Sequence, residues 1–350
     1  MLLRCSHVRR GMTLVELMVV VAIIGLLAVA VLPALSSTAE LRRGREAARV
    51  LSSFVAKSHS RAVGQREWAG FQISGVGPGS FAAVDLSLVD VPPVYRGDTT
   101  PALVSISGTP SATQRTVTGT LSPANVFQPS GTATVRAGDL VSFASAGPVY
   151  EVVGLTANTL TFKLRGDQAY ASEDAGNQLH NTPWPPTNAA LSFEVIRQPV
   201  GSGSPIALPE GRVVDLYWSG YGPPTANGGN AYVTLPNATA GPYPTRTAVV
   251  FDGTGRVRQI VTTGTTTDRK TVTGPVFLLI GRADRAVSGT AFVLNPSDDT
   301  IGANWQYSDS HWVAIDPFTG VAKSAECMAS GTTVIESQQW IRQALLSGGN

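Results

Sequence analysis

Residues Arg9–Pro33 read RRGMTLVELMVVVAIIGLLAVAVLP. A basic leader ends in a glycine, and the apolar run that follows holds one carboxylate, Glu16; from Leu17 to Leu35 there are 19 residues without a charge. That is about the length a helix needs to cross a bilayer. A carboxylate in mid-membrane costs about 3 kcal/mol, so Glu16 needs a partner and indicates a function.

A free amine is the partner that the preceding residues supply. If a protease cuts after Gly11, Met12 gains an amino group four residues before Glu16. The segment resembles the N-terminus of type IV prepilin-like proteins, the pilins and the pseudopilins of type II secretion, and the matching residues are Arg9, Arg10, Gly11, Thr13-Leu14-Val15-Glu16, Gly25 and Pro33. Met12 departs from the family pattern, in which phenylalanine is usual.

The resemblance implies a series of events at these residues. A membrane-bound prepilin peptidase and methyltransferase recognises Arg9 and Arg10, cleaves after Gly11 and N-methylates Met12. Glu16 then neutralises the amine of a neighbouring subunit during assembly, with further assembly residues at Thr13, Leu14, Val15 and Pro33. The expected partners are this enzyme, other pilin or pseudopilin subunits, and an inner-membrane assembly platform.

Two simpler readings of the N-terminus compete with this one. A secretory signal peptide has a basic start, an apolar core of about 7–15 residues and small residues at its cleavage site, here Ala34–Ser37. The apolar core of this chain is longer, and Glu16 lies at its start. A plain membrane anchor is the second reading. Neither explains the sequence Gly-Met-Thr-Leu-Val-Glu at this position.

Composition limits the fold classes and partners that the rest of the chain can have. Of 350 residues only 14% are charged, and the net charge of +2 gives no electrostatic footprint of a nucleic-acid partner. With 36 glycines, 23 prolines and 43% apolar residues, the chain is typical of a folded, β-rich extracytoplasmic protein. The basic leader favours a cytoplasmic N-terminus. We therefore expect a single-pass inner-membrane protein with a periplasmic or extracellular C-terminal domain.

The expected fold is α+β. A leader, residues 1–11, precedes a long helix, 12–66, that spans the membrane over about 14–35 and then carries one apolar stripe. Pro33 and Gly44 are its expected kink points. The helix packs on an antiparallel pilin-like β domain, 67–94 and 206–350, whose start (Ser60–Val63, then strand Trp68–Ser74) resembles minor pseudopilins of the GspH/FimT type.

Such pseudopilins are shorter, which predicts an inserted β module at residues 95–205. A stretch rich in Ser, Thr, Pro and Gly runs from Val91 to Ser130, and strand patterns follow at 138–143, 149–153 and 159–164. They resemble a small meander or an SH3-like barrel. A capping-box pattern at Thr333–Glu336 predicts a C-terminal helix.

The sequence contains no catalytic or cofactor pattern, and we expect no enzyme and no cofactor. His7, His59, His180 and His311 are far apart, and Asp298, Asp299, Asp309 and Asp316 match no calcium loop. Cleavage removes Cys5 and leaves Cys327 as a buried thiol or an intermolecular bridge. The main hypothesis is a structural filament subunit. The alternative is a membrane-tethered binding module for a secreted protein, glycan or DNA, and a hydrolase ranks third.

Overall fold

The structure is a computed structural model. It describes residues 13–77, 80–98, 100–107, 116–124, 134–164, 184–222, 233–235, 245–264, 267–272, 274–286, 302–328 and 334–346. Within these ranges it does not describe the side chains of residues 28–38, 146, 164, 234, 334, 335 and 344–346.

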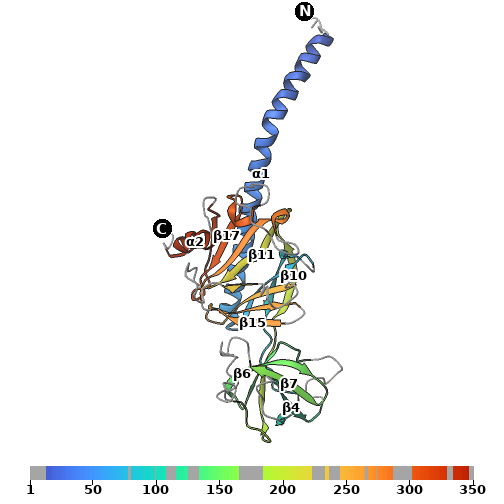
Figure 1. Cartoon of the computed structure of the whole chain (residues 1–350), viewed down its shortest axis with the longest axis vertical. Coiled ribbons are helices and arrows are strands. Elements are labelled where there is room, and N and C mark those ends of the chain that lie inside the picture. The colour runs from blue at the N-terminus through green and yellow to red at the C-terminus, as the bar shows by residue number, and fades with distance from the viewer. Residues whose placement is uncertain are drawn as a thin grey trace, which may run out of the picture.

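One long helix, α1 (Leu14–Gln65), leads into the folded head (Figure 1). Thr13 caps its start, and Arg66 ends it in the left-handed conformation with φ 55°, its N–H donating to the Val63 carbonyl oxygen at 3.4 Å. The helix is continuous through Pro33 and Gly44, so neither residue ends it. Only its second half, from about Glu40, contacts the head.

The head is built on an 11-stranded sheet in which all pairings are antiparallel. Its main path is β15 (Thr267–Thr271), β14 (Val257–Thr263), β13 (Arg246–Phe251), β1 (Ala69–Gly75), β2 (Ala82–Asp90), β11 (Arg212–Tyr221), β16 (Val276–Arg282), β17 (His311–Ile315) and β18 (Ala322–Glu326). Off this path, β10 (Val200–Ala207) pairs with β2, and β12 (Val233–Thr234) pairs with β11. Two short 3₁₀ turns, η2 (Ala283–Arg285) and η3 (Asn304–Gln306), lie between β16 and β17. The helix and the antiparallel sheet confirm the predicted α+β class.

The sheet is covered by a helix on each face, because successive side chains of a strand point to opposite sides. The α1 side of β16 and β17 carries Leu278, Ile280, Val313 and Ile315, which join one core with Ala47, Leu51 and Val55. The other side carries Phe277, Leu279, Trp312 and Ala314, which join a second core with Ile341 of α2 (Val334–Leu346). The predicted C-terminal helix therefore packs on the sheet; Thr333 of its expected capping box lies outside the described residues.

A second, separate sheet closes into a small barrel. Its strands are β3 (Leu103–Ser107), β4 (Thr116–Ser122), β5 (Leu140–Phe143), β6 (Ala146–Leu155), β7 (Thr159–Leu164), β8 (Ala190–Leu191) and β9 (Phe193–Ile196). The order β8-β3-β4-β7-β6-β5-β9 is circular, since only Ser192 separates β8 from β9. Side chains fill the interior, with Phe143, Tyr150 and Phe162 in mutual ring contact.

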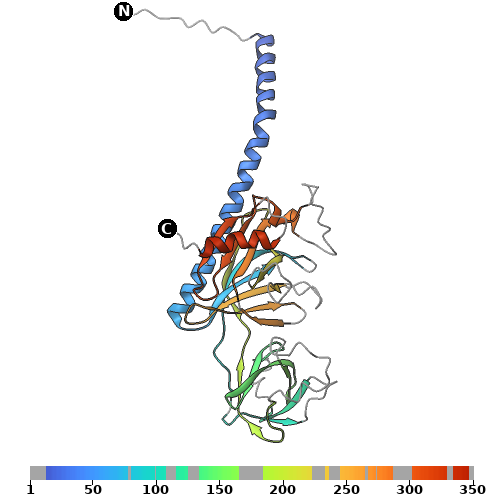
Figure 2. The ribbon, with the colours of Figure 1, turned by 60° about the vertical axis from the view of Figure 1, so that its left-hand side comes forward.

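The barrel is inserted where a hairpin turn would otherwise be. Asp90, the last residue of β2, is the antiparallel partner of Val200, the first residue of β10. The chain thus leaves the head sheet and returns to it at neighbouring positions (Figure 2). Because β10 belongs to the head sheet, the expected module boundary at residue 205 falls inside a head strand.

Polar contacts hold the barrel against the head edge at β15. Asp139 accepts from the backbone N–H of Gln198 at 2.8 Å and from Arg269 of β15 at 3.5 Å, and both charged side chains are almost fully buried. Thr267 donates to the Gln198 side chain at 3.2 Å. Gly138 has φ +86°, and a Cβ there would collide with Thr267. The barrel is therefore docked on the head and not only tethered to it.

Gly44 is needed for the close approach of α1 to the head. An added Cβ would lie 2.5 Å from the carbonyl oxygen of Asp309 and 3.3 Å from Nδ1 of His311. Overpacking of this kind costs about 1–3 kcal/mol. The gain in helix propensity from glycine to alanine is about 1 kcal/mol.

We therefore expect Gly44→Ala to lower the free energy of unfolding. Gly64→Ala, in the same helix, is the matched control, because its Cβ meets nothing within 4 Å. It should be neutral or raise stability by up to about 1 kcal/mol. Urea unfolding of both variants in detergent micelles checks this. Equal stability of the two variants would show that the contact at Gly44 is unimportant.

Candidate functional site

The predicted site residues lie at the start of α1. Thr13 is its N-cap, Leu14 and Val15 open the first turn, and Glu16 is the third helical residue. Arg9, Arg10, Gly11 and Met12, at which cleavage and methylation are expected, lie outside the described residues. Pro33 lies within α1, but its side chain is not described.

Thr13 and Glu16 form a capping box. The Thr13 hydroxyl accepts from the Glu16 backbone N–H at 3.2 Å, while Glu16 Oε2 accepts from the Thr13 backbone N–H and hydroxyl, both at 3.1 Å. This arrangement pairs donors at a helix start that would otherwise lack partners. Within the described residues Glu16 Oε1 has no hydrogen-bond partner. The capping box holds the carboxylate through Oε2.

This capping box was not predicted, although the same Thr-x-x-Glu pattern predicted the C-terminal helix at Thr333–Glu336. The signal was available as Thr13-x-x-Glu16 directly before an apolar run. It assigns Glu16 a second role, as a local helix cap. The structure therefore adds a reason for threonine at residue 13.

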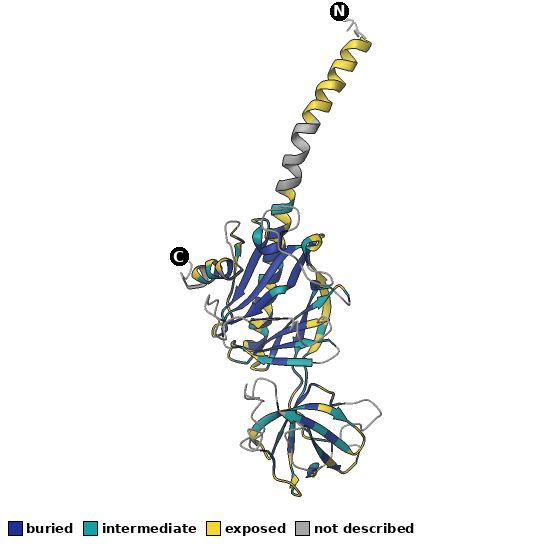
Figure 3. Cartoon of the chain, viewed as in Figure 1, coloured by how far each residue is buried: buried dark blue, intermediate teal, exposed yellow. Residues whose placement is uncertain are grey.

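The apolar side chains of α1 from Leu14 to Leu27 are not buried by the described part of the chain. Every described residue from Thr13 to Leu27 is exposed (Figure 3), and Leu14 and Leu26 each keep 74% of their surface. Apolar surface of this extent is typical of contact with lipid or with another protein. Among the described residues, no helix combines the length and apolar composition required to cross a membrane.

The other candidate residues in the described part of the chain make packing and turn contacts. His59 packs edge-on against Phe251, whereas His311 lies in β17, where burial lowers its pKa. Asp316 accepts from the backbone N–H groups of the turn after it. In the described part of the chain no group of His, Cys, Asp or Glu is arranged to hold a metal ion. His180, Asp298 and Asp299 lie outside that part.

Cys327 is a buried free thiol. Only 3% of it is exposed, and burial raises its pKa well above the usual value. A thiol with a raised pKa carries little thiolate at neutral pH and is a poor nucleophile. Its position in the core beneath α2 matches the structural role given first in the sequence analysis.

A shallow apolar pocket lies where the barrel joins the head. It measures about 210 Å³ and is lined by Glu67, Trp68, Ile196 and the segment Val91–Val94. Sites for drug-sized ligands are usually about 300 Å³ or larger. The pocket therefore has room for one or two side chains of a polypeptide.

Comparison with known proteins bears on the N-terminus. Residues 6–32 match the family model for the prokaryotic N-terminal methylation motif. No curated protein and no solved structure matches the chain. The motif implies processing by a prepilin peptidase and assembly with other pilin subunits. The match therefore supports a type IV prepilin-like N-terminus, at the start of the helix that Thr13 and Glu16 open.

Proposed function

We propose that this chain is a minor structural subunit, of the GspH/FimT type, in a type II secretion pseudopilus or a type IV pilus. It is cleaved after Gly11, N-methylated at Met12 and held in the inner membrane by the first half of α1. Its head lies in the periplasm or outside the cell. It works by assembly and not by catalysis, and its further partner is the inner-membrane assembly platform.

The observation that carries this proposal is the single carboxylate at the start of an exposed apolar helix. Glu16 is capped through Oε2, which leaves Oε1 to pair with the methylated amine of Met12 in the next subunit. The exposed side chains from Leu14 to Leu27 supply the lateral contacts between helices. In a low-dielectric environment such a charge pair is strong enough to choose one stacking height among otherwise similar apolar contacts.

The position of the barrel supports a minor subunit at a filament tip. The barrel lies at the end of the head opposite to the N-terminus of α1 (Figures 1 and 2). In a bundle of parallel α1 helices it points away from the membrane. A subunit stacked directly beyond this head would meet the barrel, which a closely packed repeated subunit avoids.

Replacing Glu16 by alanine tests the assembly mechanism. Leaving one member of a buried pair unmatched costs about 3–5 kcal/mol, so incorporation into filaments should fall at least about 100-fold. Cleavage after Gly11 should continue. The measurement is the fraction of mature chain that cross-links to other subunits in sheared filament preparations.

Glu46→Ala is the matched control for this experiment. Glu46 lies on the same helix, is exposed, and reaches Arg49 only at 4.0 Å. Its replacement should leave incorporation unchanged. Normal incorporation of Glu16→Ala would refute the pairing mechanism.

The alternative function is a membrane-tethered binding module that presents the barrel to a secreted protein, glycan or DNA. The barrel has its own core and enters the head at a hairpin position, so the head does not need it to complete its sheet. The apolar pocket at Trp68, where the barrel joins the head, is one place for such a partner to bind. In this case filament membership is secondary.

Deleting the barrel separates the two functions. Replacing residues 91–199 by a short Asn-Gly turn joins Asp90 to Val200, which already pair in the sheet. We expect the head to keep its thermal midpoint within a few degrees and the subunit to enter filaments normally. Loss of exoprotein release alone would support binding by the barrel. Loss of incorporation with an intact head would contradict a purely accessory barrel.

A further inference from the structure

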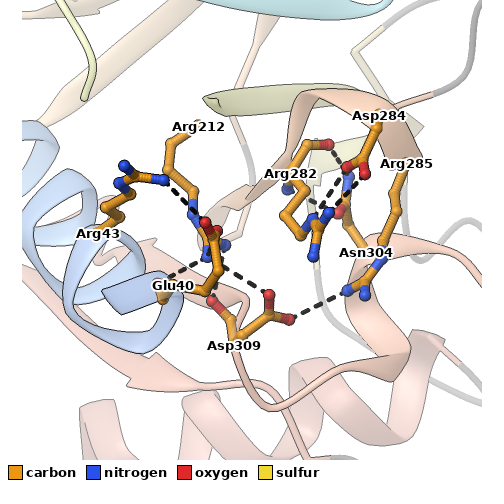
Figure 4. A network of polar contacts seen from close by, with 8 residues as sticks. All are labelled: Glu40, Arg43, Arg212, Arg282, Asp284, Arg285, Asn304 and Asp309. Atoms are coloured by element: carbon orange, nitrogen blue, oxygen red, sulfur yellow. Dashed lines mark hydrogen bonds and ion pairs between the residues drawn. The ribbon is translucent and has the colours of Figure 1, made fainter. Parts of the chain in front are cut away.

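A cluster of charged residues surrounds the point where α1 meets the head (Figure 4). At its centre is Arg212 of β11, whose side chain has no exposed surface. Its Nη2 donates to the carbonyl oxygen of Glu40 at 2.7 Å and to Glu40 Oε2 at 2.9 Å. Its Nη1 donates to the carbonyl oxygen of Asp309 at 3.0 Å, and Arg285 holds the Asp309 carboxylate at 3.1 Å. Glu40, Arg212, Arg285 and Asp309 are called the Arg212 cluster below.

Net stability is a poor explanation for this cluster. A guanidinium taken out of water loses its hydration, and the partners gained in the interior often only balance that loss. Buried ion pairs of this kind are better known for selecting one arrangement among several. The two carbonyl oxygens matter here, because they belong to the backbones of α1 and of the loop before β17. Arg212 thus joins three elements at defined backbone positions.

The apolar stripe of α1 leaves its axial position poorly defined. Besides Gly44, the buried residues of this part of α1 are Ala47, Ala48, Leu51, Phe54, Val55, Ser58 and Ala62, most of which have another of the set three or four positions away. A slide by one turn, about 5.4 Å, would again place mostly apolar side chains on the sheet. Such packing alone favours burial of the stripe without strongly favouring one register.

Glu40 and Gly44 distinguish one axial position of α1 from the others. Only a residue without a Cβ fits against the carbonyl oxygen of Asp309, and a one-turn slide would bring either Glu40 or Ala48 to that place. The same slide would remove Glu40 from Arg212. Both contacts are satisfied in a single register.

We propose that the Arg212 cluster sets the axial register of α1 against the head, with Arg212 as the positioning residue. This inference rests on the proposed function, since it gives the register a purpose. Glu16 lies 24 residues before Glu40, about 36 Å along the helix. The cluster thereby fixes the height of each head relative to the Glu16 contact with the next subunit.

Double electron–electron resonance on the full chain in detergent micelles tests the proposal. Spin labels replace Val21, exposed on the protruding part of α1, and Ser324, exposed on β18, in a background without Cys5 and Cys327. The intact cluster should give one narrow distance distribution. Arg212→Met should add a population displaced by about 5 Å, one helical turn.

Leu279→Ala controls for a general loss of stability. Leu279 is fully buried on the face of the sheet that carries α2, away from α1. When each protein is measured the same number of degrees below its own melting temperature, Leu279→Ala should show the same single spin–spin distance as the parent chain. If Arg212→Met does not fold, Glu40→Gln, at a partly exposed residue, should still broaden the distribution.

The outcomes distinguish this inference from the proposed function. A parent-like distribution in a folded Arg212→Met chain, or in Glu40→Gln where Arg212→Met does not fold, would overturn the register role and leave the Glu16 mechanism untouched. Broadening of equal size in Leu279→Ala would also overturn it. Glu16→Ala should retain the parent distance even though it fails to assemble.

Discussion

The structure depends on one helix that serves two environments. From Leu14 to Leu27, α1 exposes apolar side chains that the head does not cover, which is typical of a surface that contacts lipid or other helices. The second half buries a single stripe against the sheet. Glu16 stands at the start of the first half and the Arg212 cluster at the start of the second. Polar contacts thus lie at the start of each half of α1.

The head packs on α1 and carries an additional domain, the barrel. Alternation along β16 and β17 gives the sheet two apolar faces, one for α1 and one for α2. The barrel enters between β2 and β10 without interrupting either face, and the buried contact between Asp139 and Arg269 orients it. Burial raises the pKa of Asp139, as expected for a carboxyl group enclosed between two domains. Because the barrel is docked, the head fixes the position of the barrel relative to α1.

Much of the fold and of the N-terminal site could be predicted from the sequence, because these features depend on local patterns. The motif before Glu16 is a short run of specific residues, and the extent of α1 and strands β1 and β7 follow from periodicity. Strands β3 and β4 were not assigned, because Thr, Ser and Gly between their apolar residues resemble a loop. Strand β10 is exposed almost throughout and has no apolar alternation. The role of Arg212 was not predictable, because its partner Glu40 lies 172 residues away in the chain.

In the proposed mechanism, proteolysis after Gly11 creates the amine that Glu16 neutralises. Intact-mass and N-terminal peptide analysis of the chain purified from membranes tests this cleavage most directly. We predict a mature chain that begins at N-methylated Met12. A chain that still carries residues 1–11, or one that begins beyond the apolar segment, would contradict it.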